Sequence, residues 1–281
     1  MKKLQRWKGL LFVLPSLVGV TLFFILPALR SLKYCFTQGM AHPKFIGLAH
    51  FIALFQNEGY QIALKNTLFI IGIALPLLFS ASLVIALLIE RNIKKYRFIQ
   101  GFLLIPMALP AASVIFLWKD VFAKEGIINA LIGTRIDWLQ SDYAPFAIIG
   151  IILWKNIGYD VLLMVSSLLT ISRDFEEAAS LEGAGFWQLA FKVKVPMIVP
   201  ILFFSLIISL LNCFKIFNEV YLLVGEYPSE KLYMLQHFMN NNFKNLDYEL
   251  LATAAFILYM GIFAIIYGVT RWQQRYIHLN I

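Results

Sequence analysis

Long runs without a charged residue recur along this chain, and each is close to the length that a helix needs to cross a membrane. A helix rises about 1.5 Å per residue, so about 20 apolar residues span the hydrocarbon core of a bilayer. Five such runs lie between Lys8 and Arg30, Lys65 and Glu90, Arg97 and Lys119, Lys194 and Lys215, and Glu249 and Arg271. A sixth, from Tyr143 to Ser172, is interrupted by Lys155 and Asp160. The runs predict six transmembrane helices.

The composition agrees with a membrane protein, because only 14% of the residues are charged, against about 25% in an average soluble domain. No repeat of 20–50 residues, low-complexity segment or linker divides the chain. We therefore expect an all-α polytopic protein with a single transmembrane domain over residues 1–281. The first run is too long for the apolar core of a signal peptide and lacks a small-x-small cleavage site, which favours an uncleaved span. The expected spans are about 9–29, 66–89, 98–118, 143–171, 196–222 and 250–270.

The lysines and arginines predict how the chain is oriented. They gather before the first span, in the short loop after the second and in the tail: Lys2, Lys3, Arg6, Lys8; Arg91, Lys94, Lys95, Arg97; Arg271, Arg275. With six spans all three groups lie on one side, which the positive-inside rule makes cytoplasmic. The last outer loop is mainly acidic. Both termini and the loop 173–195 are then cytoplasmic. The net charge of +8 is explained by these membrane flanks rather than by binding to nucleic acid.

Patterns for catalysis or metal binding are missing from the sequence. Cys35 and Cys213 are isolated, with no CxxC and no nearby pair of histidines, so neither a disulfide framework nor a metal site is predicted. No G-x-x-x-x-G-K-[ST], H-E-x-x-H or G-x-S-x-G occurs. The histidines fall in expected loops and the tail, where we expect them to be solvated: His42, His50, His237 and His278. The sequence predicts no catalytic residue and no cofactor bound by this chain.

The loop between the fourth and fifth spans reads EEAASLEGAGFWQLAFKVKVP and predicts a short capped helix. Asp174 is the expected N-cap, with Glu177 reaching back to it as in a capping box. Acidic residues at this end suit the helix dipole. Small residues follow at Ala178 and Ala179, and Gly183 fits a left-handed stop. An ordinary interfacial helix would carry cations and bulky apolar residues on opposite faces, so docking into another protein is the favoured interpretation.

This loop resembles the signature of the membrane subunits of binding-protein-dependent ABC importers, E-A-A-x3-G-x9-I-x-L-P. The matching residues are Glu177-Ala178-Ala179, Gly183 and Val193-Lys194-Val195-Pro196, in which valine replaces isoleucine and leucine. Further segments are similar, in order, to the carbohydrate-uptake branch of that family: 45–55, 63–70, 101–122, 136–139, 152–164 and 214–223. One departure is Gly225-Glu226-Tyr227-Pro228, where relatives are richer in glycine.

The resemblance implies a type I importer architecture in a bacterial cell membrane, with a cytoplasmic coupling helix. It implies that Glu177, Ala178, Ala179, Gly183 and Pro196 couple the chain to a separate ATPase, which binds ATP and Mg. The implied partners are a similar second permease, ATPase subunits (two copies or two related chains), an extracellular solute-binding protein and the lipid bilayer. The implied cargo is a sugar or oligosaccharide.

Ionisable residues inside a span cost about 2.5–3.5 kcal/mol on insertion scales and usually face a cavity or pathway. Two polar faces are expected, at about 100° per residue: Lys155, Asn156, Tyr159 and Asp160 on the fourth span, and Ser209, Asn212, Lys215, Asn218 and Glu219 on the fifth. Such faces suit a neutral polyhydroxylated solute. A structural reading pairs Lys155 with Asp160 and Lys215 with Glu219. The resemblance implies that Asn156, Tyr159, Asn212 and Asn218 line the substrate path.

Two other classes of function compete with the importer subunit. A secondary transporter or channel acting alone would show internal repeats and more spans, or a filter motif such as TVGYG. A membrane enzyme would need a catalytic constellation. ATP dependence of uptake separates an importer subunit from a secondary transporter or channel.

Overall fold

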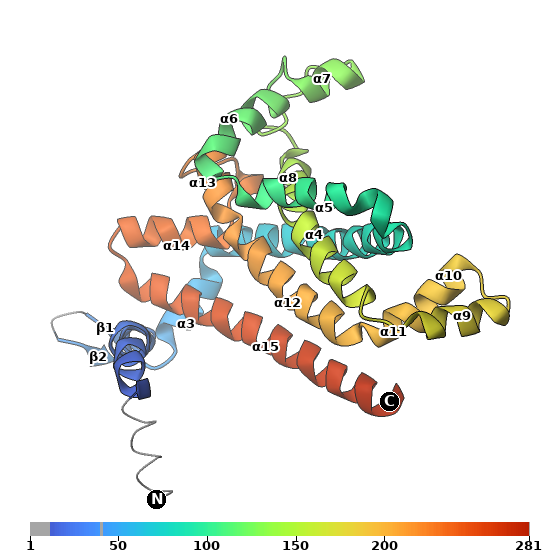
Figure 1. The fold of residues 1–281 in the computed structure, drawn as a ribbon. Helices are drawn as coiled ribbons and strands as arrows, with labels where there is room; N and C mark the ends of the chain where they lie inside the picture. Colours follow the sequence, from blue (N-terminus) through green and yellow to red (C-terminus); the bar gives the residue numbers. More distant parts are fainter. Residues whose placement is uncertain (1–11, 40–41, 281) are drawn as a thin grey trace, which may run out of the picture. The chain divides into compact units, whose positions relative to one another are not determined.

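The computed structural model describes residues 12–39 and 42–280, and these ranges are almost entirely helical (Figure 1). The N-terminal cations Lys2, Lys3, Arg6 and Lys8, together with the side chains of Lys94, Lys95, Arg97 and His278, lie outside the described residues. The elements before the fourth span are η1 (Thr21–Ile25), α2 (Leu26–Tyr34), β1 (Thr37–Gln38), β2 (Lys44–Phe45), α3 (Ala49–Gln56), α4 (Glu58–Arg91), α5 (Ile93–Ala108), α6 (Ala111–Phe122) and α7 (Ile127–Ile132). The remaining elements are α8 (Ala144–Leu168), α9 (Arg173–Leu181), α10 (Phe186–Leu189), η2 (Ala190–Lys194), α11 (Val195–Met197), α12 (Val199–Lys215), α13 (Phe217–Val224), η3 (Glu230–Leu232), α14 (Leu235–Lys244) and α15 (Tyr248–Asn280).

Within the described ranges, five helices are long and apolar enough to cross a membrane. They are Phe12–Tyr34, Glu58–Arg91, Ala144–Leu168, Val199–Val224 and Tyr248–Arg275. A bent pair, Gly101–Ala108 with Ala111–Ile132, passes as a sixth span when its two parts are taken together. The expected all-α polytopic membrane fold is confirmed. The division into one domain with spans at the expected boundaries stays a prediction.

The third apolar run does not form the single straight helix that its length predicts, because prolines interrupt it. α5 ends at Ala108 and α6 begins at Ala111, and the two helices meet at an angle of 100°. Between them Leu109 and Pro110 are extended, with ψ of 133° and 137°. A proline disfavours helical geometry at the residue before it and cannot donate a backbone hydrogen bond. Leu109 therefore leaves the helix, and the chain turns.

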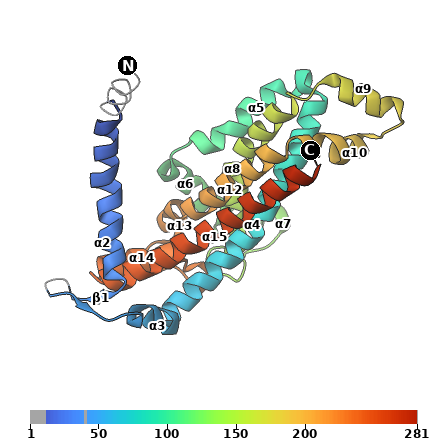
Figure 2. The same ribbon diagram turned by 90° about the horizontal axis from the view of Figure 1, so that it is seen from below.

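The chain divides into two compact units, one of residues 62–237 and 263–281, the other of residues up to 61 and 238–262. In the first unit α8 packs against α5 and α12 (Figure 2). Its apolar core falls into two clusters, one around Ile148 and Ile152 of α8 and one around Met164 and Leu168 nearer the end of that helix. Residues of α4 and α12 complete both clusters, so the long helices pack against one another through buried aliphatic side chains.

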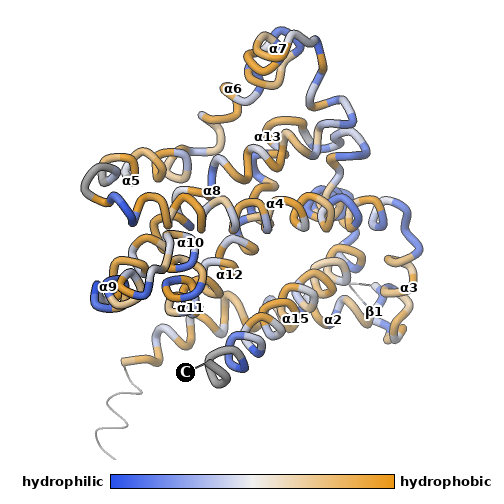
Figure 3. The backbone as a smooth tube through the Cα atoms, turned by 90° about the vertical axis from the view of Figure 1, so that its right-hand side faces the viewer, coloured by the Kyte–Doolittle hydropathy of each residue, from blue (hydrophilic) through white to orange (hydrophobic). Residues whose placement is uncertain are grey.

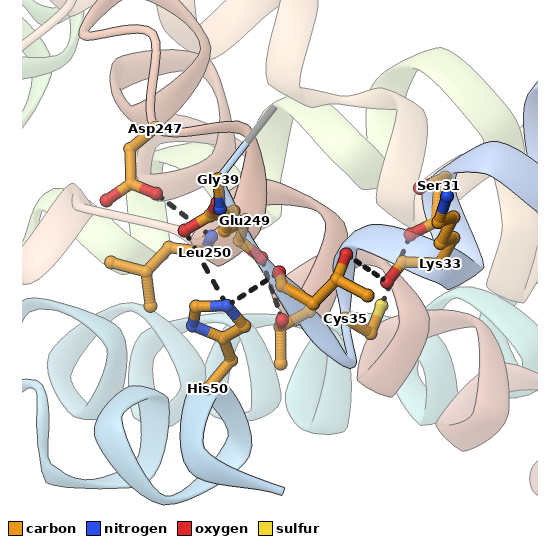
Figure 4. Close-up of polar contacts among 10 residues, drawn as sticks. Ser31, Lys33, Cys35, Gly39, His50, Asp247, Glu249 and Leu250 are labelled. Atoms are coloured by element: carbon orange, nitrogen blue, oxygen red, sulfur yellow. Dashed lines mark hydrogen bonds and ion pairs between the residues drawn. The ribbon is translucent and has the colours of Figure 1, made fainter. Parts of the chain in front are cut away.

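The second unit carries a small polar network that joins a hairpin to the start of α15 (Figure 4). β1 and β2 pair antiparallel, with Thr37 opposite Phe45. The carboxylate of Glu249 accepts a hydrogen bond from the Gly39 backbone N–H at 2.6 Å and lies 3.6 Å from Nε2 of His50. The same His50 nitrogen is 3.2 Å from the Thr37 carbonyl oxygen. The network fixes the hairpin against two helices, so a short sheet is added to an otherwise helical chain.

Two histidines correct the expectation that all four are solvated: the His50 side chain is only 12% exposed, and His237 departs further from it. His237, in the first turn of α14, is fully buried. Its ring packs edge-on against Phe217, with 4.9 Å between ring centroids, and its Nδ1 accepts the Met234 backbone N–H at 3.2 Å. Burial penalises the charged imidazolium and lowers the pKa of His237 to about 4. His237 therefore lies in an apolar site that the polar composition of 235–244 does not reveal.

Candidate functional site

The loop between α8 and α12 forms a helix, but its N-cap is not the expected residue. Ser172 is the N-cap: its Oγ accepts the Asp174 backbone N–H at 3.3 Å and donates to the Asp174 carboxylate at 2.9 Å. Asp174 is thus inside the first turn, and the capping box that would pair it with Glu177 is absent from this described segment. Ser172 takes the role because its backbone is extended, with ψ of 139°, which is the geometry of a capping residue.

The end of α9 is as the sequence predicts. Gly183 has φ of +81°, in the left-handed region that residues with a side chain rarely adopt. Its backbone N–H bonds to the Ser180 carbonyl at 3.0 Å, and Ala184 bonds to Ala179 at 3.0 Å. The chain then reverses, and the Gln188 side chain accepts the Gly185 backbone N–H at 3.0 Å to start α10. The glycine is therefore needed for the turn between the two short helices.

The two faces of α9 have different surroundings. Arg173, Glu176, Glu177 and Ser180 line a cavity of about 840 Å³. Apolar side chains on the rest of the loop are exposed: Phe175, Leu181 and Trp187, with Leu181 90% exposed. Ala178 is exposed and Ala179 half-buried. Figure 3 shows hydrophobic residues along α4 and α12 and hydrophilic ones gathered at α9.

The cavity lies between this loop and the junction of α4 with α5. Glu90 and Arg91 at the end of α4 line one wall, and Phe186 of α10 lines another. The guanidinium of Arg91 sits 4.9 Å from the centroid of the Phe186 ring, which is cation–π geometry. Glu177, expected to point at a partner protein, is an exposed residue at the edge of this cavity. Its carboxylate is accessible to a group that enters there.

Lys155 makes a different ion pair from either of those considered. Its ammonium pairs with the Glu219 carboxylate on α13, so neither the Lys155–Asp160 pair nor the Lys215–Glu219 pair forms. Lys215 is exposed. Asp160 lies 140° round the helix from Lys155 at about 100° per residue, so the two side chains diverge. The pair borders a space of about 10 Å³ beside Pro106 and Trp154, which is the size of a single water.

Asp160 is buried and bonded to the fifth span. The Ser205 hydroxyl donates to one carboxylate oxygen at 2.9 Å and the Ser209 hydroxyl donates to the other at 2.6 Å. The three residues thus cross-link α8 to α12 through hydrogen bonds. Asn156 is also buried and donates to the Ile152 carbonyl of its own helix at 2.8 Å. Asp160, Asn156 and Ser209 are therefore held inside the helix packing.

The other expected path residues are accessible to different degrees. Tyr159 and Asn212 are half-buried, and Asn218 is exposed. Trp154 makes an edge-to-face contact with Trp118 of α6, with ring centroids 5.3 Å apart. The aromatic side chains thus come from the bent helix pair as well as from α8. Among the expected path residues, the structure brings Lys155 together with Glu219 and Asp160 together with Ser209. Asn156, Tyr159, Asn212, Lys215 and Asn218 lie on separate stretches of α8, α12 and α13.

Three features of the site are not expected from the sequence. Lys194 is buried and bridges two carboxylates, Ser205 bonds to Asp160, and Gly158 allows close packing of two spans. A lysine just before a span that begins with a proline is a weak signal. A serine four residues before a second serine is a weak signal as well. Each depends on a residue far along the chain.

The comparisons with known proteins agree on one family. Residues 66–278 match the profile of the binding-protein-dependent transport system inner membrane component. The sn-glycerol-3-phosphate transport system permease protein UgpA of Salmonella choleraesuis (strain SC-B67) is 32% identical over 219 residues, which are 75% of this chain and 74% of that protein. The lactose transport system permease protein LacF of Rhizobium radiobacter is 26% identical over 230 residues, 79% of this chain and 77% of that one.

A solved structure shows the same fold. A chain of a bacterial ABC transporter involved in the import of the acidic polysaccharide alginate superimposes with a TM-score of 0.85, covering 98% of both chains at 22% identity. The resemblance found in the loop 177–196 is thereby confirmed over most of the chain. This multi-pass membrane protein belongs to the family of inner membrane components of binding-protein-dependent transport systems.

Proposed function

We propose that this chain is a permease subunit of an ATP-driven importer for a sugar or oligosaccharide. It forms the translocation path with a second permease and receives solute from an extracellular binding protein. Its relatives serve transport of lactose and of sn-glycerol 3-phosphate. ATP and Mg belong to a separate ATPase, and this chain carries no phosphate-binding loop of its own.

The exposed apolar side chains of α9 and α10 carry the proposal. Phe175, Leu181 and Trp187 are large side chains left open to solvent on a short helical loop outside the spans. Exposed apolar clusters of this kind mark interaction sites. The cations that flank the spans favour a cytoplasmic position for this loop. The partner we assign to it is the ATPase subunit, and Glu177 contacts a basic residue of that subunit.

The cargo class is supported by the paired charges on α8 and α13. Lys155 and Glu219 neutralise one another, so this point of the proposed path presents no net charge. Tyr159 and Asn212 are half-buried and Asn218 is exposed. Their hydroxyl and amide groups suit hydrogen bonds to a polyhydroxylated solute, and Trp154 supplies a ring for stacking. A neutral sugar fits these groups better than an anion does.

Uptake by the reconstituted complex tests the proposal. The chain is assembled in proteoliposomes with its second permease, ATPase and binding protein, and radiolabelled lactose, maltose and sn-glycerol 3-phosphate are offered in turn. We expect sugar uptake that requires hydrolysable ATP on the ATPase side. Uptake by this chain alone, driven by an ion gradient and indifferent to ATP, would instead identify a secondary transporter.

A further inference from the structure

Lys194 joins three elements at one buried point. It is the last residue of η2, and its Nζ lies 2.8 Å from Glu90 Oε2 and 2.9 Å from Glu176 Oε1. Glu90 is the penultimate residue of α4, and Glu176 lies in the first turn of α9. The Lys194 side chain is only 5% exposed. A lysine ammonium has three donors and no acceptor. The contact with Glu90 is a charge-assisted hydrogen bond, and the contact with Glu176 is an ion pair.

The local helix geometry explains why this lysine is buried. Residues 190–194 form a π-helix, which inserts an extra residue into the turn and rotates the side chains beyond it. Lys192, two residues earlier, remains exposed, whereas Lys194 points inward. A buried ammonium is tolerated only where carboxylates compensate the loss of water. Glu90 is 10% exposed and Glu176 30% exposed, so both partners are themselves partly withdrawn from solvent.

The contact bears on how α9 is held. α9 packs against α10, and the Glu176–Lys194 ion pair ties its first turn to the chain that leads into α12. The Glu90–Lys194 bond joins the end of α4 to the same point. Arg91 of α4 also contacts this loop, through the Phe186 ring. A displacement of α9 is therefore opposed by two spans that are far apart in the sequence.

We propose that Lys194 is a positioning residue that fixes α9 to the end of α4, so that motion imposed on α9 moves α4 and α12 together. The inference rests on the proposed function, in which an ATPase moves α9. It adds the link by which that motion reaches a span other than the two that flank the loop. The carboxylates of Glu176 and Glu90 are linked because both pair with the Lys194 ammonium.

Distance measurements between paired spin labels test this link. Labels are placed on introduced cysteines at Leu88, an exposed residue of α4, and at Arg173, the first residue of α9. Both native cysteines are buried and interfere little. Distances are compared in nucleotide-free complex and in complex trapped with ADP and vanadate. In the parent protein we expect one narrow distribution that is the same in both states.

Lys194→Met keeps the aliphatic stem and removes the ammonium. We expect it to lose the single narrow peak and to give a distance that shifts when nucleotide is trapped. Lys194→Arg should restore the narrow peak, and Lys192→Met, at the exposed neighbour, should leave it intact. Glu176→Gln is a milder variant that removes one ion pair only, and it serves if Lys194→Met fails to assemble. Samples are matched for yield and thermal unfolding, so a general loss of structure is excluded.

The outcomes separate this inference from the proposed function. An unchanged narrow peak in both Lys194→Met and Glu176→Gln complexes overturns the positioning role, whatever the ATPase does. If no ATPase assembles with the parent chain, the proposed function fails, while the nucleotide-free distance distributions of the purified chain still decide whether Lys194 fixes α9 to α4.

Discussion

A Cβ atom placed on Gly158 of α8 would overlap the carbonyl oxygen of Leu103 in α5. The two spans therefore touch through their backbones, at a point between the Lys155–Glu219 pair and the Asp160–serine bonds along α8. Small residues allow this kind of approach between membrane helices, where packing rather than the hydrophobic effect drives association. The polar residues of α8 are held in place by this contact.

Replacing Gly158 with alanine should separate α5 from α8. The obstacle is backbone, which cannot move aside as a flexible side chain does, so we expect a loss of about 3 kcal/mol, at or above the upper end for overpacking. Thermal unfolding in detergent measures it. Gly150→Ala, on the same helix with nothing within 4 Å of its added Cβ, is the control. Equal stability of the two variants would contradict the backbone contact.

Replacing Leu181 with serine should weaken binding of the ATPase without unfolding the chain. Leu181 is 90% exposed, so the substitution removes little stability from the isolated chain. Burying a leucine side chain contributes about 2 kcal/mol, which corresponds to roughly 30-fold in affinity. The dissociation constant of the purified ATPase for the membrane subunits measures the change. Leu131→Ser, at an 80% exposed leucine of α7, is the matched control and should bind normally. A Leu181→Ser complex of parental affinity argues against docking at this face.

Bulky residues in the loop should damage coupling more than loss of its acidic side chain. Gly183→Val forces a β-branched residue to φ of +81°, a strain of about 1–3 kcal/mol, and Ala179→Trp enlarges a half-buried position. Glu177→Gln removes a surface charge pair, worth about 0–1 kcal/mol. We expect ATP-dependent uptake to fall sharply in the first two and modestly in the third. Full transport in the glycine and alanine variants would rule out close packing of this loop on a partner.

The features that the sequence predicts well are those encoded by neighbours in the chain. A charge-free run specifies a membrane helix wherever it folds, and Gly183 stops α9 because the turn needs a left-handed residue. The N-cap lies two positions before the expected one, since Ser172 and Asp174 are both good capping residues. Local pattern cannot choose between them, because the choice depends on where the chain leaves α8.

Features that depend on distant residues could not be predicted. Lys155 finds its carboxylate 64 residues away at Glu219 rather than 5 residues away at Asp160. His237 is buried by packing against Phe217 and Tyr233, although its own helix is rich in amides. Both outcomes are set by which helices pack together. A single sequence gives the faces of each helix but not their partners.

The stability of this protein should fall as the pH drops from 6.5 to about 4. Burial lowers the pKa of His237 to about 4 from 6.5, so in this interval the unfolded chain binds a proton that the folded chain does not. Protonation then favours unfolding. The free energy of unfolding falls by up to about 3 kcal/mol once the pH is below the pKa of His237 in both the unfolded and the folded chain. Thermal unfolding against pH measures the slope. His237→Asn keeps an acceptor for the Met234 N–H and should flatten it, whereas a His42→Asn control at an exposed histidine should not.

The Lys155–Glu219 pair should be more sensitive to loss of the lysine than to loss of the glutamate. The Glu219 side chain is 3% exposed and Lys155 27% exposed, and one Glu219 oxygen has no hydrogen-bond partner among the described residues. Lys155→Met leaves a buried carboxylate unpaired, which costs about 3 kcal/mol or more, while Glu219→Gln leaves an ammonium that reaches solvent.

The double variant removes both charges and should recover most of the stability in thermal unfolding, because no uncompensated charge remains. Recovery of folding without recovery of sugar uptake would assign the pair to the path, and recovery of both would make it structural. A Lys155→Met protein as stable as Glu219→Gln would show that the carboxylate is hydrated, contrary to its burial between α8 and α13.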